Sequence, residues 1–257
     1  MRPILPASVL VIAMVCAPAA LRAADTALEF DGSDDFVTFG DVSEFDFGTQ
    51  PFTIEFWLNK PDTRREAIIT KRTGCDHNSF WSIRYMPTDG NLGLEINGEQ
   101  CVNGPTIVAQ GSWHHVAFTR DGDTIRTYLD GQLYATDQHT TFAGSIGNSS
   151  PMLIGDGPCV GSDTTHAFSG TIDDLMIWDV VRTEAEIAED STGVRIGTEP
   201  GLMGYWRFDE GAGQVVGDDG GSHPGQLGSS ASIDVNDPQW VDSGVPYPVE
   251  LVLFTIE

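Results

Sequence analysis

Aspartates form the chemically most suggestive group of residues in this sequence. The run Asp31-Gly32-Ser33-Asp34-Asp35 lies where a turn between two strands is expected, so Asp31 offers a carboxylate and Gly32 an exposed carbonyl oxygen. Strand alternation places Asp173 on the buried face of a later strand, where a carboxylate is costly unless it is paired or bound to a metal. Calcium takes roughly six to eight oxygen ligands. We therefore predict a calcium site of Asp31, the Gly32 carbonyl and Asp173, with water completing the shell. The alternative is that these residues hydrogen-bond backbone amides at the rim of the fold.

Other metal or catalytic arrangements have weaker support. Asp218 and Asp219 precede His223 in a glycine-rich stretch that would suit a second ion or a solvated loop, and we favour the loop. Zinc spacing of cysteine and histidine is absent. Glycoside hydrolysis needs two carboxylates facing each other across a cleft, whereas Glu55 and Glu95 are isolated. No Gly-x-Ser-x-Gly elbow is present. The sequence therefore predicts that the protein is not an enzyme.

Amide and aromatic side chains suggest a ligand site in the loops. Carbohydrate sites combine an exposed aromatic ring with side-chain amides, and Trp81 with Asn78, Asn97 and Asn103 supply both. The alternative is that these residues only order loops around a disulfide. We predict a glycan or a glycoprotein as the ligand.

Three cysteines follow the N-terminal leader. Cys75 and Cys101 bracket two predicted strands, so a hairpin would bring their sulfurs together and we predict a disulfide between them. Cys159 would then be the unpaired thiol, although it could equally be the partner of either.

Composition excludes several partners. The chain has 257 residues, and 13 lysines and arginines against 38 aspartates and glutamates give a formal net charge of −25. Nucleic-acid binding requires clustered basic residues, and this charge repels duplexes and anionic membranes. Residues 1–23 have the basic start, apolar run and small-residue end of a secretory signal peptide. We expect export, to the medium or the cell surface, with no membrane-spanning segment.

Strand signals dominate the remaining chain. Alternating apolar and polar residues, rich in β-branched and aromatic types, are separated by Gly, Asp and Asn turns. The predicted strands are 27–30, 36–39, 52–59, 67–71, 80–85, 92–96, 114–120, 124–129, 152–154, 170–178 and 203–208. A capping-box spacing starts a short helix after Thr183. The predicted fold is all-β, a two-sheet antiparallel jelly-roll sandwich with one short peripheral helix.

Five segments in order resemble the laminin G-like and pentraxin-like jelly-roll domains of the concanavalin A-like lectin/glucanase superfamily. They are ALEFDGSDDFV (27–37), FTIEFW (52–57), GSWHHVA (111–117), YLDG (128–131) and FSGTIDDLMIW (168–178). The resemblance implies this same fold, carbohydrate or protein binding on secreted and surface proteins, and structural calcium. Glucanases of the superfamily carry a Glu-x-Asp-x-x-Glu spacing or a close variant of it, which this sequence lacks.

The C-terminal part departs from this pattern. Residues 201–213 look like the segment that opens such a domain, yet they follow its body. A permuted strand order that closes one sandwich is favoured over a truncated second copy. We predict a signal peptide at 1–23, one jelly-roll domain at 24–245, and a linker or the start of a missing module at 246–257. The predicted function is non-catalytic binding of carbohydrate or glycoprotein, supported by calcium. The alternatives are a structural adhesion module or, less favoured, a glycoside hydrolase.

Overall fold

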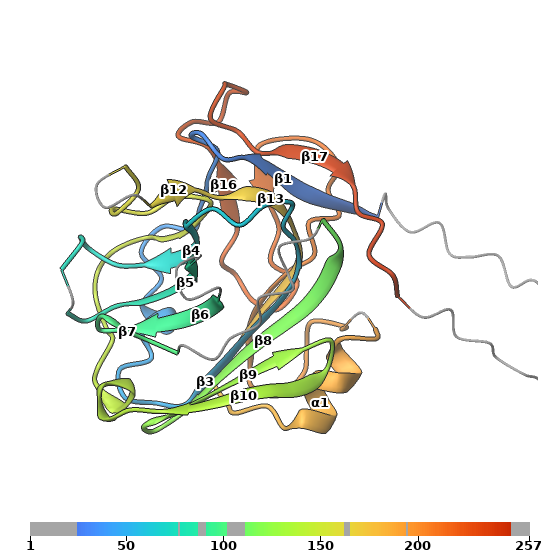
Figure 1. The fold of residues 1–257 in the computed structure, drawn as a ribbon. Coiled ribbons are helices and arrows are strands. Elements are labelled where there is room, and N and C mark those ends of the chain that lie inside the picture. The colour runs from blue at the N-terminus through green and yellow to red at the C-terminus, as the bar shows by residue number, and fades with distance from the viewer. Residues whose placement is uncertain are drawn as a thin grey trace, which may run out of the picture.

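Two β-sheets packed face to face make up the protein (Figure 1). The structure is a computed structural model, and it describes residues 25–247 except 77, 87–90, 102–110, 162–164 and 194. The predicted signal peptide and most of the 246–257 segment lie outside the described residues.

The first sheet contains the long strands, and all of its neighbouring strands are antiparallel. In spatial order it consists of β10 (Gln132–Gln138), β9 (Thr124–Leu129), β8 (Trp113–Asp121), β3 (Phe52–Asn59), β13 (Ser169–Trp178), β1 (Thr26–Asp31) and β17 (Gln239–Asp242), with β14 (Leu202–Trp206) also paired to β13.

The second sheet contains shorter strands. Its order is β15 (Val215–Val216), β16 (Gly225–Leu227), β2 (Val37–Thr38), β11 (Met152–Ile154), β4 (Glu66–Lys71), β5 (Trp81–Met86), β6 (Asn91–Ile96) and β7 (Glu99–Gln100). One parallel pair, β12 (His166–Ala167) with β4, interrupts an otherwise antiparallel arrangement.

The core lies between the sheets and is built by alternation. On β3, Ile54, Phe56 and Leu58 are fully buried in it, and Ile83 and Tyr85 on β5 meet them from the other sheet. The predicted fold class, an antiparallel jelly roll with one short helix, is confirmed. Most strands that the sequence analysis missed have only two to four residues, too few for a period-two pattern to register.

Strand pairing brings the two ends of the described chain together. β17 pairs with β1 along Thr26–Glu29, and β14 pairs with β13, so the C-terminal segment completes the first sheet. Figure 1 shows β1 and β17 side by side. The aspartate turn that follows β1 and the loop that precedes β17 therefore share one rim of the sandwich.

The single α-helix of the described chain, α1 (Glu184–Asp190), covers the outer side of the first sheet near β9 and β10 (Figure 1). Its capping box is formed as predicted, because Thr183 accepts from the Glu186 amide while the Glu186 carboxylate accepts from the Thr183 amide. Within the described residues, no helix has the length and apolar character needed to cross a membrane.

Candidate functional site

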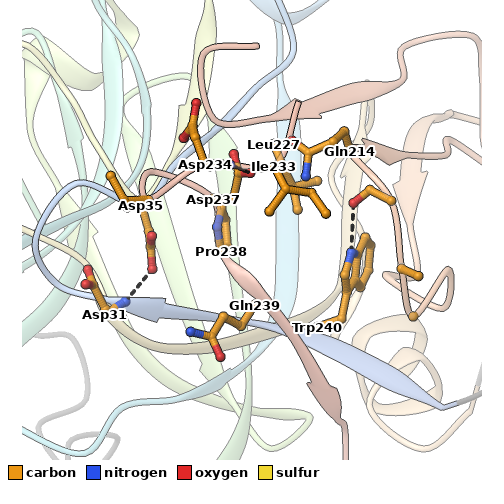
Figure 2. A pocket seen from close by; sticks show the side chains of 14 residues that line it. Asp31, Asp35, Gln214, Leu227, Ile233, Asp234, Asp237, Pro238, Gln239 and Trp240 are labelled. Atoms are coloured by element: carbon orange, nitrogen blue, oxygen red, sulfur yellow. Dashed lines mark hydrogen bonds between the residues drawn. The ribbon is translucent and has the colours of Figure 1, made fainter. Parts of the chain in front are cut away.

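A cavity of about 650 Å³ opens at the rim where β1 and β17 meet, and we name it the rim pocket (Figure 2). Three chain segments form it: the turn after β1, the loop before β15 and the loop before β17. The lining residues are Asp31, Asp35, Gly211, Ala212, Gly213, Gln214, Leu227, Ile233, Asp234, Val235, Asp237, Pro238, Gln239 and Trp240.

One end of the rim pocket is the turn Asp31–Asp35. Its conformation is fixed locally: the Ser33 amide donates to Asp31 Oδ1 at 2.7 Å, and the Asp31 amide donates to Asp35 Oδ2 at 2.8 Å. As a result, carboxylate oxygens of Asp31, Asp34 and Asp35 all lie within 4.8 Å of one another. Gly32, at φ +80°, turns the chain so that the three groups converge.

Asp35 is the electrostatically unusual member of this cluster. Its side chain is buried, whereas Asp31 and Asp34 are exposed. Burial is the main cause that raises the pKa of Asp35 to about 6; the hydrogen bond from the Asp31 amide opposes this rise, and the charges of Asp31, Asp34 and Asp237 contribute to it. A divalent cation would relieve this repulsion, so the three carboxylates have the chemistry of a cation site.

The loop before β17 docks onto this turn. The Asn236 side-chain amide donates to Asp34 Oδ2 at 2.6 Å, and the Asn236 carbonyl accepts from the Phe36 amide at 3.3 Å. Asp234 and Asp237 belong to the same loop and bring two further carboxylates to the rim pocket. Figure 2 shows them between the Asp31–Asp35 end and the tryptophan end.

The other end of the rim pocket is apolar. Trp240 lies on β17 with its indole fixed by a hydrogen bond from Nε1 to the Gly213 carbonyl at 3.1 Å. Ile233 and Val235 on the neighbouring loop are 82% and 81% exposed. Two aliphatic side chains so far out of the core form a contact surface beside the carboxylates.

The structure places the predicted calcium ligands in two different regions. Asp31 and Gly32 lie in the turn, but β1 and β13 pair Asp31 with Ser169, which leaves Asp173 four ladder positions away, about 13 Å along the strands. The predicted trio is therefore not brought together. The carboxylates that lie beside Asp31 are those of Asp34 and Asp35. The occurrence of three aspartates within five residues is the sequence feature that could have predicted this cluster.

A β-bulge explains the misplacement of Asp173. The register between β13 and β3 shifts between Asp173 and Met176, and Asp173 lies opposite Trp57 on the outer face of the sheet. Alternation counted back from Ile177 predicts the core face instead. On the outer face Asp173 is nonetheless buried, and its carboxylate accepts a hydrogen bond from the Ser243 hydroxyl. Burial and the adjacent Asp174 raise the pKa of Asp173 to about 9.

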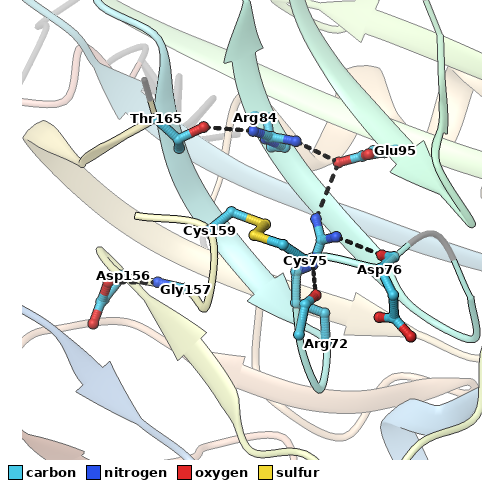
Figure 3. The surroundings of a disulfide bond; sticks show 10 residues. Arg72, Cys75, Asp76, Arg84, Glu95, Asp156, Gly157, Cys159 and Thr165 are labelled. Carbon is cyan, nitrogen blue, oxygen red and sulfur yellow. Dashed lines mark hydrogen bonds and ion pairs between the residues drawn. A yellow bond between two sulfur atoms is a disulfide. The ribbon is translucent and has the colours of Figure 1, made fainter. Parts of the chain in front are cut away.

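The predicted Cys75–Cys101 disulfide is wrong, because Cys75 is bonded to Cys159 (Figure 3). The short β7 hairpin, which the sequence analysis missed, turns Cys101 back along β6, where it is buried and its sulfur accepts from the Leu94 amide. Burial raises the pKa of the Cys101 thiol to about 12, so this thiol is unreactive. Cys159, left open as a possible partner, is the true one.

The predicted loop site for glycans is not supported as a cluster. Trp81 is fully buried on the inner face of β5, and its Nε1 donates to the Phe45 carbonyl at 3.1 Å, so the expectation of an exposed ring is wrong. Asn97 shapes a turn, accepting from the Phe80 amide and donating to the Ser145 carbonyl. Asn78 is exposed and Asn103 lies outside the described residues.

Asp218 has a structural role in the described chain. Its carboxylate oxygens accept hydrogen bonds from three backbone amides, those of Tyr205, Gly220 and His223. This arrangement matches the loop that the sequence analysis favoured over a second ion site, since the oxygens already serve the backbone.

A buried pair under α1 lies away from the rim pocket. Glu55 and His115 face each other across β3 and β8 with 3.6 Å between Oε2 and Nε2, and both side chains are fully buried. Burial lowers the pKa of His115 to about 3, and burial raises the pKa of Glu55 well above its ordinary value. Trp178 donates to the other Glu55 oxygen at 2.6 Å. Burial thus favours the neutral form of both groups, and the facing atoms Glu55 Oε2 and His115 Nε2 are not hydrogen-bonded.

The His115 environment predicts acid sensitivity. A histidine held neutral when folded takes up a proton on unfolding, so the free energy of unfolding should fall as the pH drops from about 6.5 towards 3, by up to about 1.4 kcal/mol per pH unit. His115→Phe should flatten this slope in denaturant titrations across that range. The matched variant His114→Phe, at the neighbouring position, should retain it; an unchanged slope in His115→Phe would refute the assignment.

The fold is a concanavalin A-like sandwich, and comparison with known proteins agrees. The chain belongs to the family described as the concanavalin A-like lectin/glucanases superfamily, whose Laminin_G_3 model matches residues 31–188. Pentraxin-related protein PTX3 of Mus musculus is 28% identical over 146 residues, 54% of this chain and 38% of that protein. The chain thus spans less than half of the length of the curated relatives it matches.

Two solved structures share the fold over most of the chain. One is a protein from Bacteroides ovatus ATCC 8483 whose description suggests carbohydrate binding, with a TM-score of 0.66 and 20% identity over 89% of this chain and 62% of that chain. The other is the native heptameric SAP-like pentraxin of Limulus polyphemus, with a TM-score of 0.56 and 19% identity over 83% of this chain and all of that chain. At these identities the likeness concerns the fold alone.

Proposed function

We propose that this domain binds carbohydrate or glycoprotein ligands in the rim pocket, that calcium in the Asp31–Asp35 turn supports the pocket, and that the domain is not catalytic. One observation carries the proposal: an aromatic and two exposed aliphatic side chains share a cavity with converging carboxylates. Ligand pockets combine apolar walls with a few placed polar groups in this way. The carbohydrate-binding description of the Bacteroides ovatus protein, which shares the fold, is consistent with it.

Calcium fits the donor set of the turn. Carboxylate oxygens of Asp31, Asp34 and Asp35 lie close enough to surround one ion, and oxygen ligands of this kind suit calcium. Two of the three groups are exposed, so water can complete the shell. The ion would hold Asp35 ionised and fix the turn against the Asn236 loop, which forms the opposite wall.

The same geometry argues against hydrolysis. Glycosidases place their two carboxyl groups on opposite sides of the scissile bond. Asp31, Asp34 and Asp35 belong to one turn and converge on one point. These three groups can surround an ion and do not by themselves flank a sugar ring, which leaves Asp234 and Asp237 on the facing loop for contact with the ligand.

Export is part of the proposal. The Cys75–Cys159 disulfide suits an oxidising compartment, and residues 1–23 have the features of a signal peptide. The acidic surface would keep such a protein soluble and away from anionic membranes.

Removal of calcium should lower stability. Calcium at about 100 times its Kd should raise the free energy of unfolding by about 2.7 kcal/mol, because only the folded turn assembles the site. Asp35→Asn should abolish this gain, as measured by thermal unfolding with calcium and with chelator. Asp121→Asn removes an exposed acid at the end of β8 and should respond like the parent protein. Equal unfolding temperatures with calcium and chelator in the parent would contradict the calcium site.

A glycan array probed with and without calcium tests the binding function. We expect calcium-dependent binding that Trp240→Ala weakens by about tenfold or more, since a stacked aromatic contributes about 1 kcal/mol beyond its buried area. Tyr134→Ala is the matched control, because Tyr134 is 47% exposed on β10, at the opposite edge of the same sheet. Cleavage of any array polysaccharide, or binding that survives Trp240→Ala in the folded variant, would overturn this assignment.

A further inference from the structure

The charged side chains that line the rim pocket are all carboxylates. Asp31, Asp35, Asp234 and Asp237 line it and Asp34 adjoins it, while the lining contains no lysine, arginine or histidine. A ligand that enters this pocket therefore meets a concentrated negative potential.

Neighbouring cations do not cancel this charge. One arginine, Arg64, approaches the turn at Gly32, but its guanidinium is paired with Asp62 at 2.6 Å and with Glu66 at 3.3 Å. A calcium ion in the turn would neutralise two of the five negative charges. Asp234 and Asp237, which lie on the other loop, accept hydrogen bonds from the backbone amides of Asn236 and Asp234, but neither is paired with a cationic side chain of the described residues.

A second feature of the rim pocket, its apolar wall, suits a ligand larger than an ion. Ile233 and Val235 flank the carboxylates and are each more than four-fifths exposed, and Trp240 closes the far end of the pocket. Such side chains contribute binding energy only when they cover apolar surface. The C–H face of a pyranose ring offers that surface, which a metal ion or a small amine does not.

We propose that the rim pocket selects carbohydrates that carry free amino groups, so that an ammonium group meets Asp234 and Asp237 while the ring packs on Trp240, Ile233 and Val235. The inference rests on the carbohydrate-binding function proposed above. It also excludes sugars with carboxylate, sulfate or phosphate groups, because these would add like charge to the pocket.

The decisive comparison uses two probes with the same sugar backbone, one with free amino groups and one with acetylated ones. A glucosamine hexasaccharide and its fully N-acetylated counterpart are titrated calorimetrically against the full chain in calcium, at a pH where the amines are protonated. We expect the amine form to bind about tenfold more tightly, the factor that one or two partly exposed ion pairs supply. The difference should shrink as salt is added, because salt screens such pairs.

Variants assign the effect to named groups. Asp234→Asn keeps a side-chain oxygen that can accept from the Asn236 backbone amide, as Asp234 Oδ1 does at 2.9 Å, and it should remove most of the preference for the amine form. Asp121→Asn removes the same charge outside the pocket and should leave the preference intact. Loss of preference in both variants would indicate a general charge effect and would overturn the inference.

The outcomes separate this inference from the function on which it rests. Equal affinity for both hexasaccharides, or a preference for the acetylated one, refutes the selection of amines and leaves carbohydrate binding in place. Binding of neither hexasaccharide, with calcium-dependent binding of other glycans on the array, refutes the inference alone. Absence of any glycan binding refutes both.

Discussion

Trp81→Ala should lower the free energy of unfolding by about 3–5 kcal/mol, the cost of removing a large aromatic side chain from a core. The Trp81 ring is fully buried between the sheets, close to Phe47, and its Nε1 is satisfied by the Phe45 carbonyl. The variant thus leaves a cavity and an unpaired carbonyl oxygen. Urea denaturation followed by circular dichroism would measure the change.

The conservative variant separates packing from ligand binding. Trp81→Phe should retain most of the stability and all of the glycan binding, because the ring does not reach the solvent. Tyr134→Ala, which removes an exposed ring, should change stability by less than about 0.5 kcal/mol. If Trp81→Ala folds with parental stability and loses only ligand binding, the buried position is wrong.

Cys75→Ser should destabilise the domain by about 4 kcal/mol. The disulfide joins residues separated by 84 positions, and closing a loop of that length restricts the unfolded chain strongly. It ties the loop after β4 to the loop after β11, beside Arg72, whose guanidinium bonds to the Gly74 and Asp76 carbonyls (Figure 3). Denaturant titration without reducing agent would measure the loss.

The double variant provides the internal control for this bond. Cys75→Ser combined with Cys159→Ser should be no less stable than Cys75→Ser alone, since both lack the same crosslink. Cys101→Ala should cost far less, because it removes one small buried side chain and no crosslink. A large loss in Cys101→Ala with none in Cys75→Ser would restore the pairing predicted from the sequence.

Residue patterns predicted elements where side-chain alternation was long. The ranges predicted for β3, β9 and β11 agree with the structure at both ends, and the capping box at Thr183 starts α1 as expected. β10 was missed because most of its side chains are exposed and leave no apolar period. Trp81 was misassigned although it alternates with Ile83 and Tyr85, a pattern that predicts the core.

The candidate site was predictable in part. Asp31 and Gly32 were placed in a turn with cation-binding chemistry, and the turn is there. Asp173 was assigned to it by counting alternate residues, and a bulge in β13 invalidates that count. A bulge adds a residue to one strand without a local sequence signal that single-strand alternation can detect.

By itself the sequence determined an acidic, two-sheet antiparallel jelly roll with an aspartate turn after its first strand, because alternation, turn residues and charge are local properties of the chain. Only the tertiary structure decided which groups meet. Pairing of β17 with β1 brings Asp234, Asp237 and Trp240 close to a turn about 200 residues earlier in the chain. The disulfide between Cys75 and Cys159 likewise joins two loops that are distant in sequence. Such contacts depend on strand order and register, which arise from packing the whole core and not from any one segment.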